Sequence, residues 1–513
     1  ALPTAGMGGI LTRHILAGRT GLFPFCTLAL EGPLRSGLWK TLIFLKPGIL
    51  MHHVARIFSW FVAALSLGIV QPVAAAESRA PLALTGATIF DGTGAPVTEG
   101  VILVLGERIV AMGPREQVSL PDNAEIIDLN GHWITPGLID AHVHFFQSGS
   151  LYTRPDVVDL RRFWRYETEI AWIRERLPAT LTRYLASGIT SVVDMAGPEW
   201  VLEVRDLAKQ TTTAPRVAAA GQGLAPGLPP ALSGEYAPGI TVRSPQEARI
   251  AVNRLAARRP DLLKIWFVPT PAMDLDKEFV WIHAAIDESH AMGLRVAAHA
   301  TDLELARRMA RAGVDILVHS VDNEPVDKAF IDLLKQRNVI YVTTLGVSEG
   351  YRETLTQEIQ LSDFERRRGD PAVIASLDDL AEHFPRYRRP EALPDSGTAL
   401  KNLARVHAAG ITVAAGSDAG NIGTLHGPAL HRELELMSQA GLSPREILVT
   451  ATRNGAITMG REDDLGTLQP GKLADILILN ADPLQDIRHT RHISAVVKGG
   501  VLYRPDQLMR RLQ

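Results

Sequence analysis

A series of short apolar segments, each followed by a longer amphipathic stretch, fills the chain from Gly137 onward. This series constrains the fold strongly, because strands that alternate with helices pair in parallel and build an α/β sheet. One amphipathic stretch, residues 302–313, places Leu305, Ala306 and Met309 on one side, as expected for a helix that covers a sheet. The candidate strands are residues 138–143, 189–195, 216–221, 262–267, 295–300, 315–320, 339–344 and 411–416. Eight strand–helix units in series predict a TIM-type (β/α)8 barrel.

Short strands of alternating apolar and polar residues flank the predicted barrel on both sides. Residues 82–135 show this pattern between Gly, Asp and Asn, and LGTLQPGKLADILILN and ISAVVKGGVLY return to it near the end of the chain. Because neither part is large enough to bury a core alone, we expect a small β-sandwich domain built from both chain ends. The expected boundaries are 77–135 and 457–513 for the two parts of the β-sandwich and 136–456 for the barrel.

One connection of the predicted barrel is unusually long. The insertion at about residues 345–395 follows Thr344 and contains charged, helix-like text such as SDFERRRGD. Insertions after barrel strands lie at the functional face, where this one can form a lid. Its arginines are candidates for recognising a substrate carboxylate, with solvated helix faces as the alternative. They are Arg366, Arg367, Arg368, Arg386, Arg388 and Arg389.

Residues 51–76 have the layout of a secretory signal peptide. A basic region with Arg56 precedes an apolar run over residues 57–70, and small residues end at Ala76, where we expect cleavage. A membrane anchor is the alternative, but the run is short for a bilayer. We therefore expect a secreted or periplasmic protein with no stable membrane anchor after cleavage. Residues 1–50 do not begin with Met and are interpreted as an upstream extension that is not native.

Charge and cysteine content restrict the partners and the metal chemistry. A net charge of -3 and a pI of about 6.6 indicate no nucleic-acid partner, so we expect a small-molecule substrate. Assembly into a homo-oligomer is left open. The only cysteine is Cys26, which excludes a thiolate metal site or a disulfide framework. Any metal must be held by His, Asp, Glu or a modified Lys.

Polar side chains with metal-binding chemistry stand on several predicted strands. In GLIDAHVHF, His142 and His144 share one face of a strand, because residues i and i+2 point the same way, and imidazoles bind metal ions. Lys264 lies in the apolar text LLKIW, where an ammonium is costly to bury without partners. The plainer alternatives are polar strand ends and, for the aspartate of GSDAG, a turn or helix cap. The candidates are His142, His144, Lys264, His299, His319 and Asp418. Their convergence on one rim of the barrel favours a metal centre.

This pattern of strand-borne residues resembles the amidohydrolase superfamily, over roughly residues 82–505. The order and spacing are similar to its imidazolonepropionase-related, prolidase-like members with a binuclear centre. The segments GSDAGNIGTLHGPALHRELELMSQAGLSP and LGTLQPGKLADILIL are especially similar to that group. The resemblance implies a barrel joined to a β-sandwich, as expected above from the strand pattern.

The resemblance also implies the roles of the site residues. Lys264 would be carbamylated by CO2 and would bridge two divalent metal ions, with zinc as the expected metal and manganese or cobalt as alternatives. His142 and His144 would bind the more buried ion beside Asp418. His299 and His319 would bind the second ion.

The function implied is hydrolysis of a C–N bond in an amide, such as a dipeptide or an N-acyl amino acid. A hydroxide that bridges the metals would attack the carbonyl, with Asp418 as general acid and base. An esterase, lactonase or phosphotriesterase on the same centre is the alternative, as are a cyclic-amide hydrolase, a deaminase and a non-catalytic binding relative. A carboxylate-binding arginine in the pocket would favour the amide substrate, and an all-apolar pocket would favour the ester.

Two loops depart from the prolidase-like pattern. The segment GQGLAPGLPP lacks the histidine that many of those relatives carry, and WFVPTPAMD replaces a Gly-rich turn after Lys264. Both loops are expected to line the pocket. The resemblance to the prolidase-like members therefore implies the metal centre of this chain but does not imply its substrate. His426, in the loop after the last strand, is a candidate substrate contact; alternatively, it begins the next helix.

Overall fold

The computed structural model describes residues 79–95, 97–389 and 396–512. The expected upstream extension and signal peptide, residues 1–76, therefore lie outside the described residues. Across these three ranges, no helix combines the length and apolar character needed to cross a membrane.

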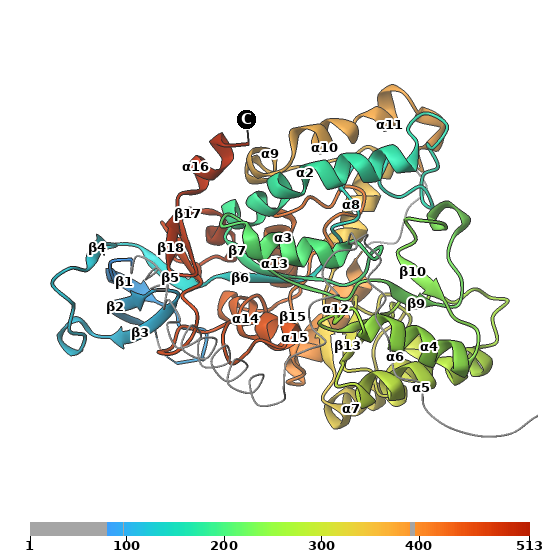
Figure 1. Ribbon diagram of the computed structural model, residues 1–513, viewed down its shortest axis with the longest axis horizontal. Coiled ribbons are helices and arrows are strands. Elements are labelled where there is room, and N and C mark those ends of the chain that lie inside the picture. Colours follow the sequence, from blue (N-terminus) through green and yellow to red (C-terminus); the bar gives the residue numbers. More distant parts are fainter. Residues whose placement is uncertain (1–78, 96, 390–395, 513) are drawn as a thin grey trace, which may run out of the picture. The chain divides into compact units, whose positions relative to one another are not determined.

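The two ends of the chain share one eight-stranded sheet. Its order is β18-β17-β16-β5-β1-β2-β3, and β4 pairs with β1. Strand β5 pairs antiparallel with β16, which places Thr135 opposite Leu477 and joins the N-terminal strands to the C-terminal ones. Figure 1 shows β1 to β4 in blue near β17 and β18 in red. The strands are β1 (Leu82–Ile89), β2 (Thr98–Leu105), β3 (Arg108–Gly113), β4 (Glu125–Asp128), β5 (Trp133–Pro136), β16 (Ile476–Leu479), β17 (Ile493–Lys498) and β18 (Val501–Tyr503).

The core beneath this sheet also draws on both ends of the chain. Leu84, Ile102 and Ile134 from the N-terminal part pack in one buried cluster with Ile476 and Val497 from the C-terminal part. Removal of either part would expose the apolar surface of the other, so the two must fold together.

The middle of the chain forms two sheets in which every strand pair is parallel, as predicted for an α/β protein. One has the order β6-β7-β8 and the other β10-β9-β11-β12-β13-β14-β15. Backbone hydrogen bonds also connect the two sheets, from Ala141 N to Ala415 O at 3.0 Å and from Asp261 N to Ala219 O at 3.0 Å. The strands are β6 (Leu138–Val143), β7 (Ile189–Asp194), β8 (Arg216–Ala219), β9 (Gly223–Ala225), β10 (Gly239–Thr241), β11 (Leu263–Ile265), β12 (Val296–His299), β13 (Ile316–Val318), β14 (Ile340–Val342) and β15 (Val413–Ala414).

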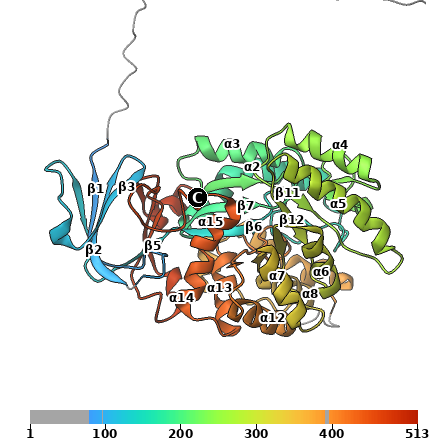
Figure 2. The ribbon, with the colours of Figure 1, turned by 90° about the horizontal axis from the view of Figure 1, so that it is seen from below.

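Helices alternate with these parallel strands and pack against them. Helix α5 contacts β12 and helix α6 contacts β13, and Figure 2 shows α5 near β12. The helices are α2 (Tyr166–Ala186), α3 (Val201–Gln210), α4 (Pro245–Ala256), α5 (Leu275–Ala291), α6 (Leu303–Ala312), α7 (Lys328–Arg337), α8 (Leu345–Thr356), α9 (Asp363–Arg368), α10 (Pro371–Ser376), α11 (Asp379–Glu382), α12 (Gly397–Ala408), α13 (Ala429–Gln439), α14 (Pro444–Thr450), α15 (Arg453–Met459) and α16 (Pro505–Arg510). Short 3-10 turns are η1 (Arg115–Gln117), η2 (Pro230–Leu232), η3 (Pro385–Tyr387) and η4 (Ile487–Arg491).

Helix α6 illustrates why these segments are helical. The Asp302 side chain accepts a hydrogen bond from Leu305 N and so satisfies a free amide of the first turn. Gly313 ends the helix in the left-handed conformation, at φ 103°. Leu305, Ala306 and Met309 are buried, as their spacing predicts. The apolar side of the helix thus covers the sheet and leaves its charged side in solvent.

The segment after β14 begins with a helix whose N-terminus is fixed to the last part of the fold. Helix α8 starts directly after Thr344, and the carboxylate of Glu433 on α13 accepts hydrogen bonds from Leu345 N at 3.0 Å and Gly346 N at 2.8 Å. Glu433 is fully buried and therefore caps α8 from inside the protein. This capping holds α8 over the ends of the strands.

Candidate metal centre

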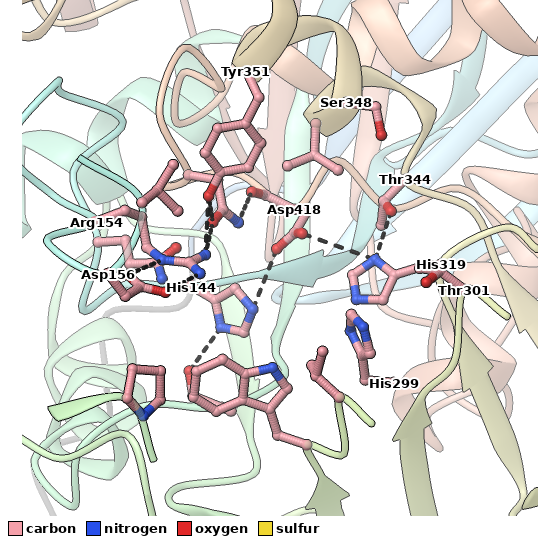
Figure 3. A pocket seen from close by; sticks show the side chains of 18 of the residues that line it. His144, Arg154, Asp156, His299, Thr301, His319, Thr344, Ser348, Tyr351 and Asp418 are labelled. Atoms are coloured by element: carbon pink, nitrogen blue, oxygen red, sulfur yellow. Dashed lines mark hydrogen bonds and ion pairs between the residues drawn. The ribbon is translucent and has the colours of Figure 1, made fainter. Parts of the chain in front are cut away.

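The six predicted ligands meet where the parallel strands end. His142 is on β6, Lys264 on β11 and His299 at the last position of β12, and the other three follow β6, β13 and β15. One cavity of about 750 Å³ has five of them in its lining: His144, Lys264, His299, His319 and Asp418. His142 is fully buried, and its ring centroid lies 5.0 Å from that of His144 and 4.9 Å from that of His319. Figure 3 shows the cavity.

His142, His144 and Asp418 form the tightest part of this cluster. The Nε2 atoms of the two histidines are 3.2 Å apart, and Asp418 Oδ1 lies 3.5 Å from His142 Nε2 and 3.2 Å from His144 Nε2. One donor atom from each residue falls within 4.8 Å of the others, which is the spacing of ligands around one ion. Three groups with metal-binding chemistry therefore point at a common space.

Backbone contacts between the first and the last strand position these three side chains. Asp418 N donates to His142 O at 2.7 Å, and the Asp140 carboxylate accepts from Ser417 N and from the Ser417 hydroxyl. His144 Nδ1 donates a hydrogen bond to Ala196 O at 2.7 Å. The lone pair of the His144 ring is therefore on Nε2, which faces Asp418. Asp418 itself has φ 54°, in the left-handed region.

His299 and His319 complete the opposite side of the cluster. Their ring centroids are 4.4 Å apart, and His319 Nδ1 lies 3.9 Å from Asp418 Oδ2 and 2.7 Å from Thr344 Oγ1. His319 also has a left-handed backbone, with φ 77°. A residue other than glycine is uncommon in this conformation, and such residues concentrate at functional sites.

Lys264 is buried, and its ammonium has no hydrogen bond or ion pair within the described part of the chain. Only 2% of the residue is exposed, and burial lowers its pKa from 10.5 to about 7. At neutral pH a large fraction of the amine is therefore uncharged and able to act as a nucleophile or a ligand.

The protonation states of the cluster suit a metal ion. Burial lowers the pKa of His142 and of His299 well below the usual range and that of His319 to about 3, so all three are neutral imidazoles. Burial also raises the pKa of Asp418, but the adjacent His142 and His144 outweigh this effect and keep the pKa well below its usual value. Neutral imidazoles and a carboxylate are the metal-binding forms.

His142 and Asp418 each also have one buried atom without a hydrogen-bond partner within the described ranges. These atoms are His142 Nδ1 and Asp418 Oδ1. Buried polar atoms are normally paired, so an unpaired carboxylate oxygen that faces two imidazole nitrogens indicates a missing partner. The donor set of the cluster therefore fits a bound cation.

His426 lies apart from this cluster, and the main cavity does not include it in its lining. Its Nδ1 is 2.8 Å from the Tyr184 hydroxyl, its Nε2 is 2.7 Å from Gln147 O, and its ring stacks on Phe145. Direct contact between His426 and substrate stays a prediction. Among the arginines proposed above for carboxylate recognition, Arg389 lines the cavity.

We expect the free energy of unfolding to fall as the pH drops below about 6.5, in part because of His426. Burial lowers its pKa from 6.5 to about 4. Between these values the unfolded chain binds a proton that the native chain does not, so acid favours unfolding, by about 3 kcal/mol at pH 4. Urea unfolding of the wild type and of His426→Gln between pH 7 and pH 4 measures the effect. The variant should lose less stability with acid, whereas His383→Gln, at an exposed position, should match the wild type.

Sequence reasoning missed a polar group beside the metal-binding cluster. Arg154, in the loop after β6, donates to the Tyr351 hydroxyl at 2.9 Å and to Asn421 Oδ1 at 2.5 Å, and Asn421 Nδ2 donates to Asp418 O at 3.1 Å. Arg154, Tyr351 and Asn421 all line the cavity. The available signal was the placement of the TRPD text in the loop that follows the HxH strand, because such loops carry functional residues.

Comparison with known proteins decides the family. The model of the amidohydrolase family matches residues 133–503, which is most of the chain. The chain belongs to the amidohydrolase family. This match confirms the resemblance drawn from the strand-borne histidines, lysine and aspartate. Members of the family typically use a metal centre, and the cluster of His142, His144 and Asp418 is the candidate for it in this protein.

Individual amidohydrolase relatives are distant in sequence. The chain is 26% identical to an imidazolonepropionase from Symbiobacterium thermophilum, over 79% of this chain and 89% of that protein. It is 24% identical to a 5-methylthioadenosine/S-adenosylhomocysteine deaminase from the same organism, over 78% and 85%.

Solved amidohydrolase structures share the fold. A Xaa-Pro dipeptidase with bound methionine superposes with a TM-score of 0.64 at 23% identity, covering 83% of this chain and 100% of that one. A putative prolidase from Bifidobacterium longum gives a TM-score of 0.62 at 26% identity, covering 85% and 99%. These neighbours imply a TIM-type barrel for the parallel strands.

Proposed function

We propose that this protein is a metal-dependent hydrolase that cleaves the C–N bond of an amide. The observation that carries the proposal is the convergence of His142, His144 and Asp418 within 4.8 Å, in an amidohydrolase chain whose other predicted ligands lie on the same cavity. The names of the prolidase-like and imidazolonepropionase relatives support C–N hydrolysis as the reaction class.

The proposal includes a closed (β/α)8 barrel and a β-sandwich formed from both chain ends. The hydrogen bonds that join β6 to the segment after β15, and β8 to the segment before β11, support closure of the two parallel sheets. The eight-stranded sheet shared by the two chain ends supports the β-sandwich.

Two divalent ions, with zinc as the expected metal, would be held by the predicted ligands. His142, His144 and Asp418 would hold one ion and His299 and His319 the other, with Lys264 carbamylated by CO2 between them. The lowered pKa of Lys264 supports this modification, because CO2 reacts with an uncharged amine. The chemistry that divalent cations supply when bound is a lowered pKa of a water molecule and polarisation of a carbonyl.

The chain's own groups would orient the reaction and move the proton. Hydrolysis adds hydroxide to the carbonyl carbon and a proton to the nitrogen, which releases an acid and an amine. Asp418 Oδ1 faces the centre without a hydrogen-bond partner among the described residues, so it can take a proton from water and deliver it to the leaving nitrogen. The hydrogen bond from His144 Nδ1 to Ala196 O keeps the His144 ring in place throughout.

Hydrolysis of an ester, lactone or phosphotriester on the same centre is the second candidate. It is favoured by the apolar side chains in the cavity lining, such as Phe146, Trp266 and Val268. We expect either activity to act on a small-molecule substrate. We expect it to occur outside the cytoplasm, after removal of the signal peptide.

Metal analysis and a hydrolysis panel test the proposal. Protein expressed from Met51 should contain about two divalent ions per chain and should release amines from members of a panel of dipeptides, N-acyl amino acids, simple amides and matched esters. One ion per chain would indicate an unmodified Lys264. Ester cleavage without amide cleavage would select the second candidate, and a metal-free, inactive protein would refute both.

A further inference from the structure

Arg154 lines the cavity of the candidate metal centre, and most of its donors are already occupied by protein groups. Its Nε donates to Asp156 Oδ1 at 2.8 Å and its Nη2 to Asp156 Oδ2 at 2.6 Å. Its Nη1 donates to the Tyr351 hydroxyl and to Asn421 Oδ1. Figure 3 shows Arg154 between Asp156 and Tyr351. Four of the five N–H groups of a guanidinium are therefore in use.

This arrangement prevents Arg154 from binding a carboxylate in the usual way. A carboxylate is recognised by two parallel N–H groups on one edge of the guanidinium, and Asp156 takes the Nε/Nη2 edge. The other edge has a single free N–H, on Nη2. Asp156 also balances the charge of Arg154, and both side chains are largely shielded from solvent, with 17% of the Arg154 side chain and 10% of the Asp156 side chain exposed. To a substrate, the pair presents no net charge.

Away from the metal-binding residues, the lining formed by the described residues contains no cationic side chain besides Arg154 and Arg389. Asp322 lines the cavity with no ion pair in the described ranges, and burial raises its pKa. Phe146, Leu228, Trp266 and Met273 contribute apolar surface to the same lining. A carboxylate placed against this part of the wall, away from the metal-binding residues, would lose hydration without gaining a cationic partner.

Arg389 is the remaining arginine of the lining, and its position differs from that of Arg154. It is exposed, and its Nη2 donates to Val157 O at 2.9 Å. Solvent screens an exposed guanidinium, so an ion pair there adds little affinity. Arg389 therefore does not replace the occupied Arg154 as a site for a substrate carboxylate.

We propose that the group of the substrate next to the scissile amide is uncharged and apolar, so that the protein prefers neutral amides to dipeptides and N-acyl amino acids. This inference rests on the proposed amide hydrolysis. It assigns the Arg154–Asp156 pair a role in specificity: Asp156 cancels the charge that would otherwise select a carboxylate.

Three probes with the same scissile bond test the preference. They are N-benzoyl-L-phenylalanine, its neutral C-terminal amide, and N-benzoylphenethylamine, which has no group at that position. Release of benzoate by the metal-loaded protein gives kcat/KM for each. We expect kcat/KM for each of the two neutral probes to be at least about tenfold higher than kcat/KM for the acid. This factor corresponds to one poorly placed charge. Equal or faster cleavage of the acid would overturn the inference, whereas no cleavage of any probe, despite bound metal, would overturn the proposed function as well.

Asp156→Asn tests the role of the pair directly. The substitution keeps an oxygen to accept from Arg154 and removes the cancelling charge, so the ratio of kcat/KM for the acid to that for the neutral amide should rise at least about tenfold. The matched control is Asp159→Asn, which removes a bidentate partner from the exposed Arg161 outside the cavity and should leave the ratio unchanged. An unchanged ratio in Asp156→Asn, or a preference for the acid that disappears in Arg389→Ala, would refute the assignment.

Discussion

Asp418→Asn should lower kcat for amide hydrolysis by about 10²–10⁴-fold while leaving the fold unchanged. The substitution removes the charge and the proton-accepting capacity of the side chain and preserves its size. It is also mild for the backbone, because Asn tolerates the left-handed conformation that Asp418 adopts, at φ 54°. The expected loss therefore reports on chemistry rather than on folding.

The measurement combines steady-state kinetics with circular dichroism and metal analysis of the same preparation. Asp287→Asn is the matched control, because Asp287 is exposed on α5, outside the cavity lining, and should keep wild-type activity. If Asp418→Asn retains kcat within about tenfold of the wild type, the proposed role of Asp418 as acid and base is wrong.

Lys264→Ala should cause a loss of similar size, accompanied by loss of metal. If the lysine carries a carbamate that bridges two ions, removing it takes away one ligand from each, so metal content should fall from about two ions per chain to one or none. Added acetate or propionate should restore part of the activity, since a small carboxylate can occupy the space left by the side chain. Metal content and kcat with and without the acid are the readouts.

The modification itself can be separated from a structural role of the lysine. After addition of divalent metal, metal-free wild-type protein should regain activity slowly in CO2-free buffer and faster with bicarbonate, because the uncharged amine of Lys264 must first react with CO2. Lys472→Ala is the control: its ammonium donates to Glu462 O, its pKa is also lowered by burial, and it lies outside the cavity lining. Bicarbonate-independent recovery would show that Lys264 acts unmodified.

The strand-borne residues could be predicted because parallel topology converts sequence position into spatial position. The ends of parallel strands meet at one edge, so His299 and His319 on successive units had to become neighbours, and their ring centroids are 4.4 Å apart. The i, i+2 spacing likewise placed His142 and His144 together. No detail of loop structure was needed for either inference.

The wall of the cavity could not be predicted in the same way. Arg154 and Tyr351 are 197 positions apart, in a loop and in a helix of the long insertion, and nothing periodic in the sequence relates them. Strands β9 and β10 were also missed, since three residues each are too few to show alternation. They lie in and after GQGLAPG, one of the loops where the sequence departs from its relatives. These parts of the cavity wall thus lie in or beside irregular segments of the chain, where no periodic pattern indicates their position.

The left-handed backbone at His319 and Asp418 has a consequence for how this protein can evolve. Such a conformation costs most residues other than glycine about 1–2 kcal/mol, though less for Asp, and it is held at two positions where ligand chemistry is proposed. Replacement of either by glycine would relieve that cost and would remove a ligand. In descendants that are no longer selected for activity, the same mutations would therefore raise the melting temperature and abolish activity. Such an inactive descendant would unfold at a higher temperature than its active ancestor.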